Sequence, residues 1–263
     1  CAICSNKTNK VDATLADVSY FAYYADFGPA FMPSCRISII KNDKIGQIKL
    51  TVFNFRDTSR TLRINYVDSV VLTESDFKYF FNTLDTISLM KMKSDSSMGF
   101  DGIGVNNTCY QDSIKNAFYF WSPNKGSKEH KIVEAVIGLS RQKFTAMKCQ
   151  EYFESLEQYF DFGLPCKKIS DNLYEVRIYG SLSSNEEQEL NKFINELPSD
   201  RPVLIDMTNF EGMGTMYYPL FKNLITRNKK IVWATKYNQQ LKEIGVDTTT
   251  ISEDIETARQ WMK

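Results

Sequence analysis

Alternating hydrophobic and polar positions dominate the first half of the chain. Cys35–Ile40 and Gln47–Phe55 have the pattern of two strands joined by a short polar connection, and Thr61–Thr73 continues in the same style. Consecutive strands with short connections usually pair as neighbours, so we expect three antiparallel strands here. Two further strands are predicted at Gly99–Cys109 and Lys115–Trp121.

Helical spacing of apolar residues follows these strands. A helix is expected after the capping residues 73–76, where Phe77, Phe80 and Leu84 recur along one face, and two more are expected at Lys128–Phe144 and Gln150–Phe160. The aromatic segment 20–27 runs into Gly28–Pro29, which is a turn signal. Strands followed by helices indicate an α+β domain with an antiparallel sheet over residues 18–163, which we assign to no family.

Strands and helices alternate in the second half. After a predicted linker at 164–170, strands are expected at Leu173–Tyr179, Pro202–Asp206 and Lys230–Ala234. The helices between and after them begin with a capping box of Ser184 and Glu187 and continue at Met216–Arg227, Asn238–Ile244 and Ser252–Met262. This order predicts an α/β domain over residues 171–263, with a mostly parallel sheet and packed helices.

The second half resembles the STAS domain, the fold of anti-sigma-factor antagonists and of the cytoplasmic tails of sulfate transporters. The resemblance rests on the element order, with Gly180-Ser181-Leu182 closing the first strand, 203–208 forming the second and 230–234 the third. It implies a protein-binding role for the helix after the second strand. In the family an Asp-Ser-Ser-Gly loop opens that helix and carries a phosphorylated serine. Here residues 212–217 replace the motif, and only Thr215 could stand in for the serine.

The loop 208–215 is the candidate contact region for a partner or an anion, through Thr208, Asn209, Gly212, Gly214 and Thr215. It follows a strand at its carboxyl end and precedes a helix, whose N-terminal N–H groups favour negative charge. The two glycines fall short of a dinucleotide or P-loop fingerprint. The alternative is a plain tight turn in which Thr215 caps the helix.

Charge and composition exclude several classes. The 32 basic and 32 acidic residues cancel, and basic residues do not interleave with the aromatic run 118–121, so nucleic-acid binding is not expected. No apolar run reaches the roughly 18 residues that span a bilayer. The chain is 43% hydrophobic, which is enough to fill two cores.

The first residues suggest a lipid anchor. Cys1 followed by a polar, tether-like segment to about residue 17 resembles the start of a mature bacterial lipoprotein, in which the signal peptide is cut before the lipid-bearing cysteine. A fragment or a trimmed end is the alternative. The pair Cys1 and Cys4 lacks a second pair or a nearby histidine, so no metal or redox site is predicted. We expect most other cysteines to be buried.

No cluster gives a strong catalytic signal. His130 is the only histidine, and it is expected on a charged, solvated helix face. A cysteine or serine hydrolase that pairs His130 with Cys109 and Asn106 is one alternative, and a hydrolase with a site between the domains, using Cys109, His130 or an acidic residue, is another. The acidic pairs 186–187 and 253–254 fall in first helical turns, where the helix dipole accounts for them.

Together these patterns predict a non-enzymatic binding or regulatory protein without a cofactor, metal or small-molecule ligand. It is expected to contact a protein partner, and to reach a membrane only through a lipid on Cys1 at the bacterial cell envelope. The alternative is a cytoplasmic STAS-type switch, controlled by phosphorylation at Thr208 or Thr215 or by a small anion.

Overall fold

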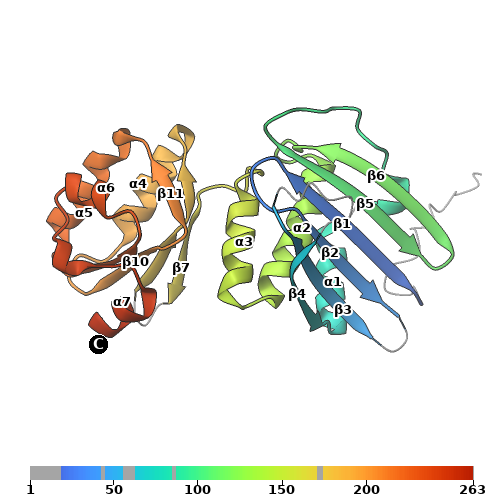
Figure 1. The fold of residues 1–263 in the computed structure, drawn as a ribbon, viewed down its shortest axis with the longest axis horizontal. Helices are drawn as coiled ribbons and strands as arrows, with labels where there is room; N and C mark the ends of the chain where they lie inside the picture. Colours follow the sequence, from blue (N-terminus) through green and yellow to red (C-terminus); the bar gives the residue numbers. More distant parts are fainter. Residues whose placement is uncertain (1–18, 43–44, 56–62, 85–86, 171–173, 263) are drawn as a thin grey trace, which may run out of the picture. The chain divides into compact units, whose positions relative to one another are not determined.

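The computed structural model describes residues 19–42, 45–55, 63–84, 87–170 and 174–262. The predicted tether, with Cys1 and Cys4, lies outside the described residues. Contacts along the chain divide it into two compact units, residues 1–150 and 151–263 (Figure 1). This boundary falls inside helix α3 (Met147–Glu157), upstream of the linker predicted at 164–170. Each unit is described separately.

Unit 1 contains an antiparallel sheet, as the sequence predicts for this part of the chain, but with six strands in place of the five expected. The strand order is β4-β3-β2-β1-β5-β6 (Figure 1). The strands are β1 (Phe21–Pro29), β2 (Cys35–Lys41), β3 (Gly46–Phe53), β4 (Ile64–Val71), β5 (Ile103–Gln111) and β6 (Ile114–Trp121). The alternating segments of the sequence therefore form strands, with ends that differ by a few residues from the predicted ones.

Strand β1 is the main difference from the expectation in unit 1. The sequence suggests only an aromatic segment ending in a turn, whereas β1 lies in the sheet between β2 and β5. Phe21, Ala22 and Tyr23 are all 0% exposed, so both faces of its first half are covered. A strand buried on both faces loses the alternation that identifies a half-buried one, and periodicity therefore missed it.

Three helices accompany this sheet: α1 (Glu74–Leu84), α2 (Lys128–Lys143) and the start of α3, with the 3-10 turn η2 (Leu89–Lys91) between α1 and β5. Helix α1 packs on β1, since the Phe80 ring centroid lies 6.3 Å from that of Phe21 and 6.2 Å from that of Tyr23. Helices α1 and α2 contact each other. All three predicted helices are thus present.

Unit 2 contains a mixed five-stranded sheet of order β13-β12-β10-β8-β7, in which only β7 is antiparallel to its neighbour. The strands are β7 (Cys166–Ser170), β8 (Glu175–Ile178), β10 (Val203–Met207), β12 (Ile231–Thr235) and β13 (Ile251–Ser252). A small parallel pair, β9 (Gly180–Leu182) and β11 (Phe210–Met213), is separate from it.

Helices connect the parallel strands of unit 2. They are α4 (Glu187–Glu196), α5 (Tyr218–Arg227), α6 (Asn238–Glu243) and α7 (Ile255–Trp261), with the 3-10 turns η3 (Ser184–Glu186), η4 (Thr215–Tyr217) and η5 (Thr248–Thr250). The predicted alternation of strands and helices is present in this unit. The capping box lies on Ser183 and Glu186, one residue before the predicted pair, and the Ser183 N–H donates to the Glu186 carboxylate at 2.7 Å.

Strand β10 is covered on both faces, as its apolar run predicts. Ile205 belongs to the larger core with Phe221 and Trp233, whereas Leu204 packs on the other face with Ile255. All five residues of the strand are buried. This strand therefore holds helices on both faces of the sheet.

Two segments of unit 2 differ from the sequence expectation. The stretch predicted as a linker, 164–170, contains strand β7. This strand lies at the edge of the sheet, and its partly exposed side chains do not alternate between buried and exposed positions. The predicted loop 208–215 contains β11, and helix α5 begins at Tyr218 after the 3-10 turn η4. Short pairings of this kind leave no periodic signal.

None of the helices in the described ranges has the length and apolar character that crossing a bilayer requires.

The start of strand β3 gives a direct test of packing in unit 1. A Cβ added at Gly46 would lie 2.5 Å from a ring carbon of Phe77 and 2.6 Å from the carbonyl oxygen of Leu72. Gly46→Ala is therefore expected to lower the free energy of unfolding by about 2 kcal/mol, measured by urea unfolding.

Gly138→Ala is the matched control, because it makes the same change in the interior of helix α2. There the nearest atom to an added Cβ is the Tyr79 hydroxyl oxygen at 3.6 Å, an ordinary contact. In this variant the free energy of unfolding is expected to rise by about 0.5–1 kcal/mol, because alanine has a better helix propensity than glycine. Equal effects of the two substitutions would contradict the packing described here.

Candidate functional site

The predicted contact residues are not gathered in one open loop. Thr208 and Asn209 form the short connection between β10 and β11, Gly212 lies in β11, and Gly214 and Thr215 lie at the start of η4. Thr208 and Asn209 are half-buried, whereas Gly214 and Thr215 are exposed. The segment therefore has an inward-facing beginning and an outward-facing end.

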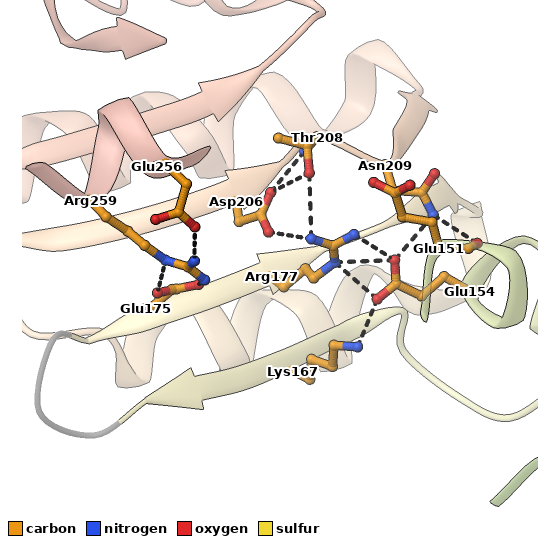
Figure 2. A network of polar contacts seen from close by, with 10 residues as sticks. All are labelled: Glu151, Glu154, Lys167, Glu175, Arg177, Asp206, Thr208, Asn209, Glu256 and Arg259. Atoms are coloured by element: carbon orange, nitrogen blue, oxygen red, sulfur yellow. Dashed lines mark hydrogen bonds and ion pairs between the residues drawn. The ribbon is translucent and has the colours of Figure 1, made fainter. Parts of the chain in front are cut away.

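The inward-facing part joins a buried polar network centred on Arg177 of β8 (Figure 2). The guanidinium donates from Nε and Nη2 to the carboxylate of Glu154 on α3, at 2.8–3.1 Å. Its Nη1 donates to Asp206 of β10. Arg177, Glu154 and Asp206 are 4%, 0% and 1% exposed, so these charges are held away from water.

Thr208 and Asn209 complete this network. The Thr208 hydroxyl donates to Asp206 Oδ1 at 2.7 Å, and its backbone N–H donates to the same oxygen at 3.0 Å. The Asn209 amide donates to Glu154 Oε2 at 3.1 Å and to the Glu151 carbonyl at 3.2 Å. These side chains therefore fix the turn after β10, and the Thr208 hydroxyl is engaged inside the fold.

The network is balanced in charge and suited to a structural role. Lys167 Nζ reaches Glu154 Oε1 at 2.7 Å, so two cations face the carboxylates of Glu154 and Asp206. Burial alone would raise the pKa of Glu154, but hydrogen bonds and charges from Arg177 and Lys167 outweigh it and hold the pKa below the ordinary value. An ionised, fully engaged carboxylate is a poor proton donor at neutral pH.

A second carboxylate on β8 is paired in the same way. Glu175 is 2% exposed and receives two hydrogen bonds from Arg259 of α7, at 2.6 and 3.0 Å (Figure 2). Bidentate pairing of this kind fixes direction as well as charge. It ties the last helix to the sheet.

The start of the helix after β11 presents few free N–H groups. The Tyr217 N–H donates to the Gly214 carbonyl at 3.1 Å, the Tyr218 N–H donates to the Thr215 carbonyl, and Pro219 has no N–H. An anion at a helix terminus depends on such groups. The anion-binding role of this segment thus stays a prediction without further support from geometry.

An open groove of about 360 Å³ lies beside this helix start, lined by Tyr218, Tyr237, Gln239, Gln240 and Glu243. Tyr218 begins α5, Tyr237 follows β12, and the other three residues belong to α6. Because β12 runs parallel to β10, the groove lies at the carboxyl edge of the sheet, where α/β folds commonly bind ligands. We call it the Tyr218–Tyr237 groove.

Both tyrosines of the groove are held in position. The Tyr237 ring meets the buried Phe210 ring edge-on, with centroids 6.1 Å apart and an interplanar angle of 86°. The Tyr218 hydroxyl donates to Glu243 Oε2 at 3.1 Å. Phe210 belongs to β11, so the segment predicted as a contact loop packs against Tyr237, one of the residues that line the groove.

The position of His130 corrects the sequence expectation. It was predicted on a solvated face, but it is 1% exposed, and its Nδ1 lies 3.6 Å from Glu134 Oε1. Helix α2 is buried around much of its circumference, including Ile132, Val133, Ala135, Val136 and Leu139, so charged neighbours in sequence did not mark an exposed face.

The hydrolase alternative is not assembled on β5. Cys109 is 1% exposed and Asn106 is exposed, and their odd spacing places them on opposite faces of the strand. Burial raises the pKa of the Cys109 thiol to about 12, so it remains protonated and unreactive at neutral pH. Cys35 and Cys149 are buried as well, as expected. In the described ranges no three His, Cys, Asp or Glu residues are grouped to hold a metal ion.

Sequence reasoning missed the residues that organise this region. Arg177 gave one usable signal, a charge between Val176 and Ile178 in an apolar strand, which implies a buried partner. Its partner Glu154 lies on a helix 23 residues earlier and gave no signal of its own. Tyr218 and Tyr237 are ordinary aromatic positions until the fold brings them together.

Compared with known proteins, the chain matches no protein-family model, and no curated protein is significantly similar to it.

The Glu154–Arg177 pair predicts a pH-dependent stability. Glu154→Gln leaves the buried Arg177 short of a negative partner, so the free energy of unfolding should fall by about 3 kcal/mol at pH 7. Because the folded pKa of Glu154 is lowered, its contribution is complete above the unfolded value of about 4.3 and disappears as pH falls through the folded pKa. Urea unfolding at several pH values should show the two proteins converging in acid.

The control is Glu196→Gln, the same change at an exposed position near the end of α4. It should shift stability by less than about 0.5 kcal/mol at any of these pH values. If Glu154→Gln lowered the free energy of unfolding by the same amount at neutral and at acid pH, the charge pairing would be contradicted.

Proposed function

We propose that the chain is a non-enzymatic binding or regulatory protein in which unit 2 is a STAS-like interaction module. The support is the order of elements in unit 2, where β8, β10 and β12 are parallel and helices connect them, together with the antiparallel edge strand β7. This is the alternation on which the resemblance to STAS domains rests. In that family the helix following the second strand of the alternation contacts partners, and α5 occupies this place here.

The observation that carries the proposal is the surface beside α5. Tyr237, which lines the groove, is 40% exposed, and Met216, two residues before the lining residue Tyr218, is 43% exposed. Aromatic residues and methionine are enriched at protein–protein interfaces. Both tyrosines of the groove are already positioned, which reduces the entropy lost on binding.

Membrane attachment enters the proposal only through Cys1. A lipid on this residue would tether the chain at the bacterial cell envelope and confine the partner search to one membrane face. Of the two threonines considered for the switch alternative, Thr215 is exposed and Thr208 donates its hydroxyl to Asp206. If the loop is phosphorylated, the phosphate is therefore expected on Thr215 and not on Thr208.

Site-specific photocrosslinking in the native cells tests the interaction surface. A photoreactive benzoyl-phenylalanine replaces Met216 or Tyr237 in the full chain, and adducts are read by mass. One adduct of constant mass is expected from both positions, because Tyr237 lines the groove and Met216 lies two residues before Tyr218, which also lines it. Met216→Glu, combined with the probe at 237, should reduce the adduct about tenfold, as expected for a charge placed in an interface.

Ile169 of β7 and Trp261 of α7 are the control positions, since they are 43% and 48% exposed in the same unit. They should yield no such adduct. The proposal fails if positions 216 and 237 give none, or if all four positions give the same products.

A further inference from the structure

From the charges and acceptors in the Tyr218–Tyr237 groove we infer that it receives an arginine side chain of the partner. This inference rests on the proposed protein-binding function and specifies the chemistry that the partner presents. Of the five lining residues one is acidic, none is basic, and two are tyrosines. The charge of the lining therefore favours binding of a cation and disfavours binding of an anion.

One acceptor of the lining residues, the buried Gln240 Oε1, receives no hydrogen bond from the described residues. A buried acceptor without a donor costs about 1–3 kcal/mol, and an N–H group that reaches this oxygen removes that cost. The Glu243 carboxylate accepts from the Tyr218 hydroxyl at one oxygen, Oε2. Glu243 and Gln240 lie on one short helix, α6, so one ligand can meet both.

The tyrosine rings suit the flat face of a guanidinium. Rings of this kind attract a cation that stacks over them, and arginine does so more often than lysine. Tyr237 is held edge-on against Phe210, which leaves its position fixed before a ligand arrives. Burial raises the pKa of Tyr218, as does the hydrogen bond to Glu243, so its hydroxyl stays neutral beside the cation.

Arginine fits this set better than lysine because its donors are arranged in a rigid fork. The fork reaches two separate acceptors at once while the guanidinium plane stacks on a ring, whereas an ammonium is a compact point charge. Lys236 and Lys242 are exposed next to the lining in sequence and weaken the attraction at long range. Recognition therefore depends on contacts inside the groove.

The test is an NMR titration of the ¹⁵N-labelled full chain with N-acetyl-arginine N-methylamide. Amide signals of Tyr218, Tyr237 and Gln240 should shift together, with a dissociation constant on the order of 1–10 mM for so small a probe. The citrulline analogue, which has nearly the same shape but no charge, should cause no such shifts. The lysine analogue should bind more weakly than the arginine analogue.

Variants assign the effect to the groove. Glu243→Gln should weaken binding about five- to tenfold, because a charge-assisted contact becomes a neutral one. Tyr237→Leu should weaken it about fivefold, whereas Tyr237→Phe keeps the ring and should stay within about twofold. Glu196→Gln, at the far end of α4, should match the unchanged protein, and unaltered spectra elsewhere show that each variant is folded.

The outcomes separate this inference from the proposed function. Equal shifts with arginine and citrulline, or tighter binding of the lysine analogue, would overturn the arginine assignment even if positions 216 and 237 crosslink to a partner. Arginine binding that Glu243→Gln leaves unchanged would also overturn it. Selective arginine binding without any crosslink would support a cation site in the groove and count against the protein-binding proposal.

Discussion

The buried guanidinium of Arg177 is the constraint on which the carboxyl edge of unit 2 depends. It lies between the carboxylates of Glu154 and Asp206, and it joins the helix that carries Glu154 to strands β8 and β10 (Figure 2). Removing water from three charges is favourable only when the pairing geometry is close to complete. The donors and acceptors of Thr208, Asn209 and Lys167 supply the additional contacts that this geometry requires.

This network also fixes the turn after β10. Thr208 and Asn209 hydrogen-bond inward, to Asp206 and Glu154, and β11 continues from the turn to pair with β9. Phe210 of β11 then packs against the ring of Tyr237, which lines the Tyr218–Tyr237 groove at the same edge of the sheet. The buried charges thus position the exposed groove indirectly, through the short strand between them.

Much of the fold follows from periodicity. The alternating segments of unit 1 and the strand and helix units of unit 2 are present. In a half-buried strand or an amphipathic helix the buried positions recur at a regular spacing, which is visible as a pattern of apolar residues. The elements that the sequence did not predict have no such regular spacing. Strand β1 is covered on both faces, β7 lies at an edge, and β11 is held by pairing with three residues of β9. The candidate site was harder to foresee, since Tyr218, Tyr237 and Glu243 come from three segments and meet only after folding.

Hydrogen exchange of the native complex tests the central claim, that the surface beside α5 is where unit 2 binds its partner. The full chain is purified from its own cells with whatever remains bound, and exchange is compared before and after the partner is removed. Our account predicts protection confined to residues 210–222 and 235–243, with the remainder of unit 2 unchanged. Protection at β7 or α7 instead, or no protection in unit 2 at all, would contradict it.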